Sequence, residues 1–251
     1  MLGLGEAGSL IAADLAAAGV AVRGFDPGTG ADAPGVTRVQ DVESAVAGCD
    51  VVVSVNAASA AAAVVEAATP ALGRDCLYAD LNTASPQLKR ELAEVVAGSG
   101  SPFADVALLG PVPPRGLRTP ALASGPGADA FAGLFGALGM PVEVVSEQPG
   151  DAAALKLLRS VFMKGLAAAA IESVQGGEAA GHAEWVRQEI AAVIGEPLLE
   201  RLLEGSRTHA ARRTDEMEAA RSLLVELGVD PHMTAASAAV LASLAVETGE
   251  P

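Results

Sequence analysis

At 251 residues the chain is long enough to bury a core in one large or two modest domains; 51% of it is hydrophobic and only 3% aromatic, so alanine, valine and leucine dominate. The net charge of −15 argues against binding to nucleic acids or anionic membranes, and no run of about 18 apolar residues is present that would span a bilayer. The first residues lack the basic region of a signal peptide, and the two cysteines and three histidines are too scattered for a disulfide framework or a metal site, so we expect a soluble, acidic, cytoplasmic protein.

The first motif is a glycine-rich turn followed by a helical stretch. Its G-x-G-x-x-G spacing is typical of dinucleotide binding: the first glycine permits a tight turn, the second lets a pyrophosphate approach the main chain, and the third lets the helix pack closely on the sheet. The N–H groups at the start of the helix would hold the phosphates. The alternative is a strand-to-helix turn without a ligand. The predicted cofactor-binding residues are Gly3, Leu4, Gly5, Glu6, Ala7 and Gly8.

An acidic residue follows at the distance that this motif requires. Asp26 lies 18 residues after Gly8, at the end of the apolar run Val20–Phe25. A carboxylate in this place accepts both ribose hydroxyls of NAD and repels the 2′-phosphate of NADP. We therefore predict NAD as the preferred cofactor.

Short apolar runs alternate with helical patterns through roughly the first 145 residues, which is typical of βαβ units and a mainly parallel sheet. The predicted strands are Val20–Phe25, Val36–Val39, Asp50–Val55, Cys76–Ala79, Phe103–Ala107, Ala121–Ser124 and Val142–Val145. The predicted helices are Gly8–Ala18, Ser59–Ala68, Pro86–Ala97 and Ala128–Leu138. Only Met1 and Leu2 remain for the first strand, whereas about five or six residues are usual. We therefore expect the true start of the protein a few codons upstream.

The pattern changes at Pro149 and Gly150, after which we predict only helices. They cover Asp151–Gln175, His182–Ile194, Pro197–Leu227, with a bend near Gly205–Ser206, and Thr234–Thr248. The fold class is thus an α/β Rossmann domain with a mainly parallel sheet, residues 1–148, followed by an all-α C-terminal domain, residues 149–251. Alanine-rich faces such as Ala167–Ala170 allow helices to approach closely, so we expect a homodimer formed through the helical domain.

This domain order resembles the β-hydroxyacid dehydrogenase superfamily, which includes 3-hydroxyisobutyrate and 6-phosphogluconate dehydrogenases. Residues 3–8 (GLGEAG) are similar to the family's GLGxMG opening, and residues 80–86 (DLNTASP) to its D-x-S-T-x-x-P loop. Residues 105–110 (DVALLG) correspond to its D-A-P-V-S-G-G substrate loop, and Gly150 with Lys156 to its G-x-G-x-x-x-K catalytic helix. The chain looks most like a less-characterised 6-phosphogluconate dehydrogenase-like subgroup with its own type of helical domain.

Lys156 is the predicted proton carrier. It lies one to two turns into a helix that follows the last strand of the cofactor domain, so we expect it at the domain seam, near the nicotinamide. Oxidation of an alcohol by NAD needs a group that accepts the hydroxyl proton, and a lysine whose pKa is lowered by burial can do so. Ser160, one turn later, is expected to hydrogen-bond the substrate hydroxyl. Lys164 is the rival proton carrier, and an ordinary solvated lysine is the alternative for Lys156.

Three polar residues complete the predicted cofactor site: Asn56, Asn82 and Thr83. Asn82 and Thr83 would position the nicotinamide amide or the substrate. They also fit a strand-to-helix turn in which Ser85 caps the helix and Pro86 occupies its first position. Gly110 is assigned to substrate binding by the resemblance to the family's substrate loop.

Departures from the family pattern point to a different substrate. Arg159 and Ser160 stand where the family has two asparagines, and Leu109 stands where its substrate loop has serine. Further along, His209, Arg212, Arg213 and Glu216 have the spacing of one helical face. We predict that Arg212 and Arg213 hold the acidic group of the substrate, because a guanidinium binds carboxylate or phosphate through two hydrogen bonds. The alternative is a solvated face with an Arg212–Glu216 pair.

The sequence therefore predicts an NAD(P)-dependent oxidoreductase that transfers hydride between a nicotinamide cofactor and a small hydroxy acid, or its aldehyde or keto form. An imine reductase of the same architecture is one alternative, although the resemblance associates that group with loss of the lysine and with NADPH. A non-catalytic NAD-binding regulatory protein is the other. The expected partner is a small acidic molecule, without nucleic acid, membrane or metal.

Overall fold

The computed structural model describes residues 1–28 and 33–248. The chain divides into two compact units, Met1–Lys156 and Leu157–Pro251. It passes from the first unit to the second within helix α6 (Asp151–Ala179), whereas the sequence predicts the boundary between residues 148 and 149, just before that helix. Among the described residues, no helix is both long and apolar enough to span a membrane.

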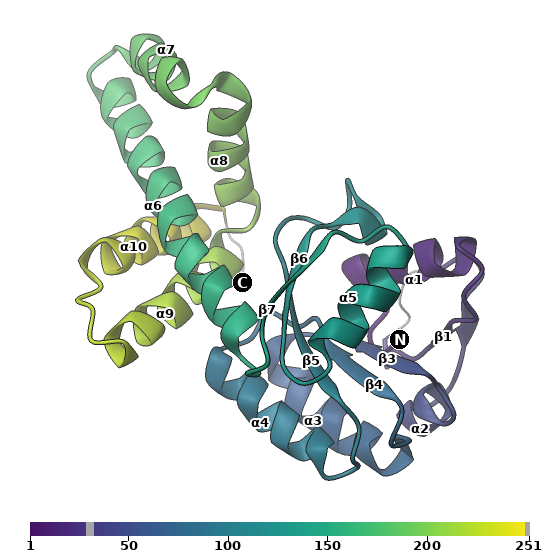
Figure 1. Cartoon of the computed structure of the whole chain (residues 1–251). Helices are drawn as coiled ribbons and strands as arrows, with labels where there is room; N and C mark the ends of the chain where they lie inside the picture. The colour runs from purple at the N-terminus through teal and green to yellow at the C-terminus, as the bar shows by residue number, and fades with distance from the viewer. Residues whose placement is uncertain (29–32, 249–251) are drawn as a thin grey trace. The chain divides into compact units, whose positions relative to one another are not determined.

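The first unit is built on a mostly parallel sheet, as the alternating sequence pattern predicts (Figure 1). Five strands pair in chain order; β6 runs antiparallel to β5, and the other neighbours are parallel. Their bounds are β3 (Val51–Ser54), β4 (Leu77–Asp80), β5 (Phe103–Leu108), β6 (Ala121–Ser124) and β7 (Val142–Ser146). Two shorter strands, β1 (Arg23–Gly24) and β2 (Thr37–Arg38), form a separate parallel pair.

Leu2 connects this pair to the larger sheet. It bridges in parallel to Phe25, which follows β1, and to Ser54, the last residue of β3. Its N–H donates to the carbonyl of Val53, and its carbonyl accepts from the N–H of Val55, both at 2.8 Å. The resulting order, β2–β1–Leu2–β3–β4–β5, is the 3-2-1-4-5-6 order of a doubly wound dinucleotide-binding fold. Even this short first strand places Gly3 at the carboxyl end of the sheet's centre.

Helices cover both faces of the sheet (Figure 1). One face carries α1 (Glu6–Ala17) and α5 (Ala128–Ala137), and the other carries α2 (Val42–Val46), α3 (Ala58–Ala68) and α4 (Pro86–Ala97). Helix α2 is missing from the predicted helices because five residues are too few to show a helical period. The side chain of Asp41 caps it by accepting the N–H of Ser44 at 2.7 Å.

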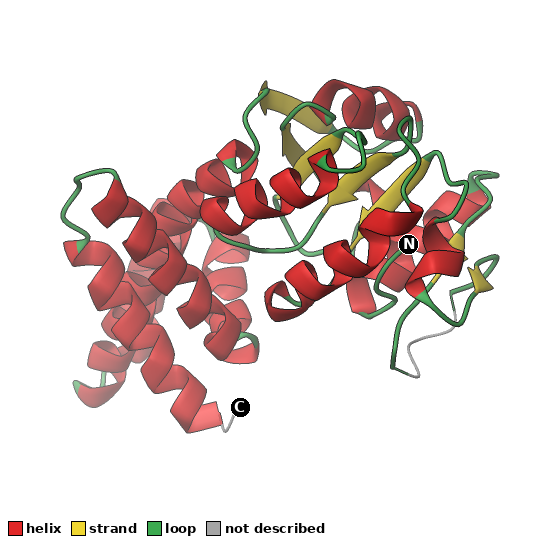
Figure 2. Cartoon of the chain, turned by 90° about the horizontal axis from the view of Figure 1, so that it is seen from below, coloured by secondary structure: helices red, strands yellow, loops and turns green. Residues whose placement is uncertain are grey.

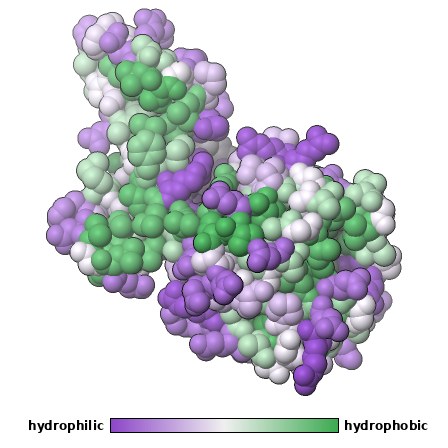
Figure 3. Space-filling view, viewed as in Figure 1, coloured by the Kyte–Doolittle hydropathy of each residue, from purple (hydrophilic) through white to green (hydrophobic). Residues whose placement is uncertain are grey.

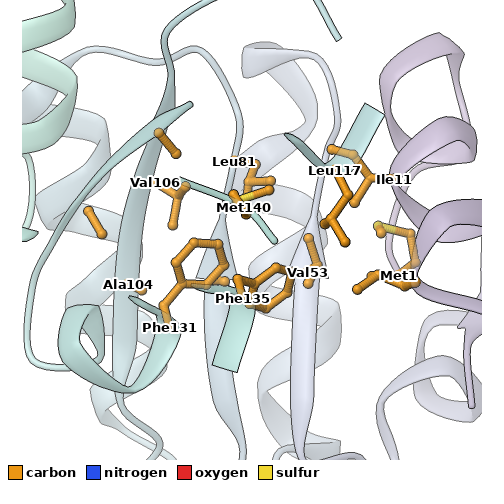
Figure 4. Packing of buried hydrophobic residues seen from close by; sticks show 14 of the residues in the cluster. Met1, Ile11, Val53, Leu81, Ala104, Val106, Leu117, Phe131, Phe135 and Met140 are labelled. Carbon is orange, nitrogen blue, oxygen red and sulfur yellow. The ribbon is translucent and has the colours of Figure 1, made fainter. Parts of the chain in front are cut away.

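Neighbouring residues of each strand point to opposite faces and so feed two cores. Figure 4 shows the first core, where Val53 and Ala104 of the sheet lie near Phe131 and Phe135 of α5. The second core contains the residues just before these in the strands, Val52 and Phe103 among them, packed on the helices of the other face. Each core also holds a stacked aromatic pair, Phe131 with Phe135 in the first and Tyr78 with Phe103 in the second.

The loop after β5 folds back onto α1. Val112 and Leu117 of this loop are buried in the first core. The Asp14 carboxylate on α1 accepts the N–H of Leu117 at 2.8 Å. Gly116 has a φ of +53°, and a β-carbon there would collide with the same carboxylate. This contact fixes the path of the segment that follows Gly110.

The second unit consists of helices in its described part, and the strands all lie in the first unit (Figure 2). After α6 come α7 (Ala183–Ile194), α8 (Glu196–Thr208), α9 (Ala210–Glu226) and α10 (His232–Thr248). Its core brings together Val174 of α6, Leu203 of α8, Met217 of α9 and Leu241 of α10. Alanines such as Ala170 and Ala238 fill the spaces between these helices.

The long helical pattern Pro197–Leu227 breaks at His209 and not at the predicted bend near Gly205–Ser206. Ser206 stays helical, and its hydroxyl donates to the carbonyl of Leu202 at 2.6 Å. The Arg213 side chain packs against Gly205, where a β-carbon would lie 2.6 Å from the guanidinium. The glycine therefore provides space for an arginine.

Candidate cofactor and catalytic site

The glycine turn has the geometry that a bound dinucleotide needs. Gly3 has a φ of +98°, and a β-carbon on it would collide with the carbonyl of Val55. A β-carbon on Gly8 would collide with the carbonyl of Gly3, so the third glycine is required for packing. Gly5, at the N-cap of α1, would meet nothing within 4 Å, which leaves open space beside the first turn of the helix. These three environments match the three roles of the motif, so the residues fit a pyrophosphate.

Asp26 lies against this turn, as the motif predicts. Its carboxylate accepts the N–H of Leu4 at 2.7 Å and the N–H of Gly28 at 2.8 Å. The guanidinium of Arg38, on β2, donates to the carbonyl of Asp26 at 3.2 Å and to the carbonyl of Gly28. An acidic and a basic side chain therefore lie together where the adenosine ribose of a dinucleotide would bind.

Asn56 and Asn82 belong to one polar cluster at the carboxyl ends of β3 and β4. Their amide groups donate to the hydroxyl of Ser54 at 2.9 and 3.2 Å, and the amide oxygen of Asn82 accepts the N–H of Asn56. Asn82 is buried, whereas Thr83 is exposed. The Asn82 amide is thus bonded within the protein, whereas the side chain of Thr83 is exposed.

Lys156 and Thr83 come together, although they are 73 positions apart in the sequence. The Nζ atom of Lys156 donates to the Oγ1 atom of Thr83 at 3.0 Å. Thr83 precedes α4, whose N-terminus is built as predicted: the Ser85 hydroxyl accepts the N–H of Leu88 at 3.2 Å, and Pro86 occupies the first turn. Two of the predicted site residues therefore share one location in the first unit.

A buried ion cluster lies below this loop, and the sequence reasoning missed it. Lys89 of α4 lies 2.6 Å from a carboxylate oxygen of Asp80 and 3.0 Å from one of Asp105, and all three side chains are at most 1% exposed. Lys89 also donates to the carbonyl of Asp80 at 2.8 Å. The signal was present: Lys89, Leu92 and Val96 share the buried stripe of α4, where a lysine is out of place without acidic partners.

Charge pairing decides the titration of this cluster. Burial alone would lower the pKa of Lys89, but the carboxylates of Asp80 and Asp105 outweigh it and raise that pKa above the ordinary value of 10.5. Burial raises the pKa of Asp80, against the opposing pull of Lys89. Lys89 is therefore held as an ammonium ion that holds the two carboxylates together.

Asp105 also binds the start of α6. Its Oδ2 atom accepts the N–H groups of Gly150 at 3.2 Å and Ala153 at 3.0 Å, and the Ser124 hydroxyl at 3.2 Å. The Ser124 hydroxyl in turn accepts the N–H of Ala152 at 3.0 Å. Orphan N–H groups at the N-terminus of a helix need such acceptors, and a negative charge is favoured there. Side chains from β5 and β6 thus cap the helix that carries Lys156.

The second unit holds a separate polar group on α6 and α9. Lys164 forms an ion pair with Glu216 and donates to the hydroxyl of Ser160 at 2.9 Å. Arg212 lies 4.0 Å from Glu216, an i,i+4 pair, and its side chain is 66% exposed. Arg213 donates to the hydroxyl of Ser206 at 2.5 Å, and burial lowers its pKa while Glu216 opposes the shift.

Gly110 is the remaining candidate among the predicted site residues. Gly110 is half-buried just after β5 and faces the Arg115 guanidinium, which a β-carbon would approach to 2.9 Å. Cys49 and Cys76 are free thiols. Among the described residues, no group of three or more histidine, cysteine, aspartate or glutamate side chains could hold a metal ion.

Two family models match the chain. Residues 1–127 match the NAD binding domain of 6-phosphogluconate dehydrogenase, and residues 178–244 match a domain of unknown function, DUF1932. An uncharacterised 28.5 kDa protein of Methanothermus fervidus is 25% identical over 160 residues, which cover 62% of this chain and 61% of that protein. The match therefore spans less than two thirds of this curated relative.

Several solved structures share the fold over nearly the whole chain. A conserved hypothetical protein from Sinorhizobium meliloti 1021 is 30% identical, with a TM-score of 0.78, over 96% of this chain and 86% of its own. The conserved protein MTH1747, of unknown function and structurally similar to 3-hydroxyacid dehydrogenases, is 28% identical, with a TM-score of 0.77, over 98% and 95%.

Two enzymes are more distant and show the fold alone. The 3-hydroxyisobutyrate dehydrogenase of Mycobacterium tuberculosis is 20% identical, with a TM-score of 0.84, over 98% of this chain and 93% of its own. An imine reductase of Streptomyces aurantiacus is also 20% identical, with a TM-score of 0.63, over 98% and 94%. The cofactor-domain model covers more than half of the chain, and the chain therefore belongs to the family built on the NAD binding domain of 6-phosphogluconate dehydrogenase, with a DUF1932 domain toward its C-terminus.

Proposed function

We propose that the protein is an NAD(P)-dependent oxidoreductase that transfers hydride between a nicotinamide and a small hydroxy acid, or its aldehyde or keto form. The observation that carries the proposal is the bond between Lys156 and Thr83, in the same compact unit as a fitting dinucleotide turn. An amine held by a loop at the carboxyl edge of the sheet lies where ligands bind to such folds. The reaction step that this amine is best suited to is proton transfer to or from a substrate oxygen.

In this proposal the bound cofactor supplies or accepts the hydride. Lys156 accepts the proton of the substrate hydroxyl during oxidation and returns a proton to the carbonyl oxygen during reduction. Thr83 accepts a hydrogen bond from the amine and so fixes its direction. Lys164, the rival, is occupied by Glu216 and Ser160, which fits a structural role better than proton transfer.

The proposed cofactor is NAD in preference to NADP, and Asp26 supports it. Its carboxylate is oriented by two backbone N–H groups toward the glycine turn and retains lone pairs for the ribose hydroxyls. Arg38 is the observation on the other side, because an arginine beside the ribose accommodates a 2′-phosphate. Calorimetric titration with NADH and NADPH decides between them: tighter binding of NADPH contradicts the proposed preference.

Roles in substrate binding are proposed for Gly110, Ser160, Arg212 and Arg213. Arg212 is the best placed of the arginines to take an acidic group, because its guanidinium is largely exposed, whereas Arg213 is engaged with Ser206. If Arg212 binds the acid group, Arg212→Met raises KM about tenfold or more and leaves kcat nearly unchanged. An unchanged KM removes Arg212 from the site and leaves it as the partner of Glu216.

The experiment that tests the function starts from a panel of small hydroxy acids, keto acids, aldehydes and cyclic imines, assayed with both cofactors. With an identified substrate, Lys156→Ala is expected to lower turnover by about 10²–10⁴-fold, the usual contribution of a general acid or base, while NADH affinity stays within about twofold. Lys156→Arg, which keeps the charge, is expected to be as inactive. Full turnover in Lys156→Ala contradicts the lysine role. Reduction of imines only, or tight cofactor binding without any turnover, would favour the alternative functions.

We also propose a second copy of the chain as a partner, through the helical unit. Phe162, Trp185 and Val193 of α6 and α7 expose 69%, 63% and 84% of their surface, which is unusual for large apolar side chains. Figure 3 shows apolar side chains gathered over the helices of this unit. Light scattering is expected to give the mass of a dimer, and Val193→Glu is expected to shift it toward the monomer. A monomeric parent protein contradicts this proposal.

A further inference from the structure

Lysine is rare in this chain, and each copy has an assigned contact. The sequence contains three lysines among its 16 basic residues, at positions 89, 156 and 164. Arginine therefore supplies most of the positive surface charge, and Lys89 is fully buried. The proposed reaction makes no use of Lys89. A buried ammonium ion is costly unless its partners compensate, so the cluster around it needs an explanation.

The cluster is part of one continuous chain of polar contacts through the first unit. The Asn82 amide, which accepts from the N–H of Asn56, donates to Asp80 Oδ2 at 2.7 Å. Asp80 Oδ1 lies 2.6 Å from Lys89, and Lys89 lies 3.0 Å from Asp105 Oδ1. The other oxygen of Asp105 accepts the N–H of Ala153 at 3.0 Å. This series of polar contacts thus runs from the loop that carries Thr83 to the first turn of the helix that carries Lys156.

The charges explain why the parts belong together. Two carboxylates face one ammonium ion, so Lys89 cannot neutralise both Asp80 and Asp105. The N-terminus of α6 supplies further positive potential, because its N–H groups point at Asp105 and the helix dipole favours an anion there. Asp105 is therefore best satisfied when the first turn of α6 is in its observed place.

Both ends of the Lys156–Thr83 contact depend on this chain. Thr83 directly follows Asn82, which is bonded to Ser54, Asn56 and Asp80. Lys156 lies three residues after Ala153, one helical turn beyond the N–H that Asp105 accepts. A shift of either segment would separate the Nζ and Oγ1 atoms.

We propose that Asp105, backed by Lys89 and Asp80, is a positioning residue that sets the first turn of α6 and thereby holds the amine of Lys156 against Thr83. It acts through the helix and has no contact with a reacting atom. The proposal rests on the proposed function only in taking Lys156 to be the proton carrier. The contacts that position this lysine lie within one compact unit and do not depend on that role.

The test measures the reactivity of individual lysine amines in the intact protein. Reductive methylation with formaldehyde and a borohydride is followed by peptide mass spectrometry, and the rate at Lys156 is divided by the rate at Lys164. Lys164 is an internal reference because its partners, Ser160 and Glu216, do not belong to the chain of contacts. The ratio needs no substrate and no cofactor.

Asp105→Ala removes the acceptor from Gly150 and Ala153, and the ratio is expected to change about fivefold, which corresponds to the loss of a helix cap. Asp105→Asn retains an acceptor oxygen and is expected to restore most of the parent ratio. Leu92→Ala is the matched control: it creates a cavity in α4 near Lys89, lowers stability and leaves every member of the polar chain in place.

The proposal is overturned if Asp105→Ala leaves the ratio unchanged, or if Leu92→Ala changes it equally. If Asp105→Ala does not fold, Ser124→Ala takes its place, since it removes the acceptor for the N–H of Ala152 and is expected to change the ratio about twofold; an unchanged ratio there has the same meaning. Failure of the proposed function would give a different experimental result. Lys156→Ala would then retain turnover, while the change of ratio in Asp105→Ala would still support the positioning role.

Discussion

Lys89 in the first unit and Lys164 in the second both pair with carboxylates, but their surroundings differ. Lys89 is 1% exposed and contacts Asp80 and Asp105, which are as deeply buried. Lys164 is 16% exposed, and its partner Glu216 is 12% exposed. The sheet of the first unit fixes the strand ends from which Asp80 and Asp105 project, so it can hold charges in its interior. The helical unit has an alanine-rich core and keeps its ion pair near the surface.

The two units differ in which elements their polar side-chain contacts join. In the first unit the polar contacts join β4, β5, β6, α4 and the start of α6, which are elements distant in the sequence. In the second unit, Lys164 and Glu216 join α6 to α9, and Arg213 of α9 contacts Ser206 of α8. Loss of a charge should therefore be costly in the first unit and mild in the second.

The largest expected effect comes from neutralising Lys89, and the same change at Lys164 gives the comparison. Lys89→Met leaves two buried carboxylates without their cation and is expected to lower the free energy of unfolding by about 3–5 kcal/mol. Lys164→Met, in a more exposed pair, is expected to cost about 1 kcal/mol. Denaturant unfolding, with hydrogen exchange to assign the loss to β4 and α4, checks both values. Equal costs for the two variants would remove the contrast.

A smaller effect is expected from alkaline pH, and it sharpens the same contrast. Burial raises the pKa of the Cys76 thiol to about 11, from 9.0, and burial with the nearby Asp80 raises the pKa of the Tyr78 phenol above its ordinary 10.0. For these two groups the folded protein favours the neutral form. The resulting stability is fully present below the pKa of the unfolded state and is lost as the pH rises toward the pKa of the folded state. Between pH 9 and 11 the loss from Cys76 is at most about 2 kcal/mol.

Tyr78 is the only tyrosine of the chain, so the phenolate absorbance at 295 nm reports the ionisation of this one side chain, which lies in the first unit. Phenolate absorbance is expected only where this unit unfolds, well above pH 10. Cys76→Ala is the control, because it should remove the stability loss between pH 9 and 11. A titration of Tyr78 near pH 10 in the folded protein would show that the second core of this unit is open to water.

The smallest expected effect concerns the cofactor site around the glycine turn. Asp26→Asn removes a charge that repels a 2′-phosphate, so the preference for NADH over NADPH is expected to fall about tenfold. Arg38→Met is the matched variant and should weaken NADPH binding more than NADH binding. Fluorescence titration with each nucleotide gives the ratios. An unchanged ratio in both variants would remove Asp26 and Arg38 from cofactor recognition.

Local chemistry was readable from the sequence. The glycine spacing of residues 3–8 requires turns and close packing that only glycine permits, and the structure has them at Gly3 and Gly8. Asp26 lies against that turn, and Ser85 and Pro86 begin α4, both as predicted. The mainly parallel sheet and the helical C-terminal region follow from periodicity alone and are confirmed.

Long-range polar contacts were not readable. Lys89 is paired with Asp105 through the packing of α4 on the sheet, and no local pattern indicates which strand end it meets. Ser124 caps α6 from a strand that runs antiparallel to β5, a reversal that periodicity does not show. The break at His209 was misplaced because Gly205 looks like a hinge, whereas its missing side chain makes room for Arg213.

The contact between α1 and the loop after β5 has an evolutionary consequence. A side chain at position 116 would require a φ of +53° and would displace the Asp14 carboxylate, which accepts the N–H of Leu117. Related sequences should therefore change the two positions together. Relatives that have lost the aspartate lack the hydrogen bond that holds the segment after Gly110 on α1, so this segment can follow a different path in them.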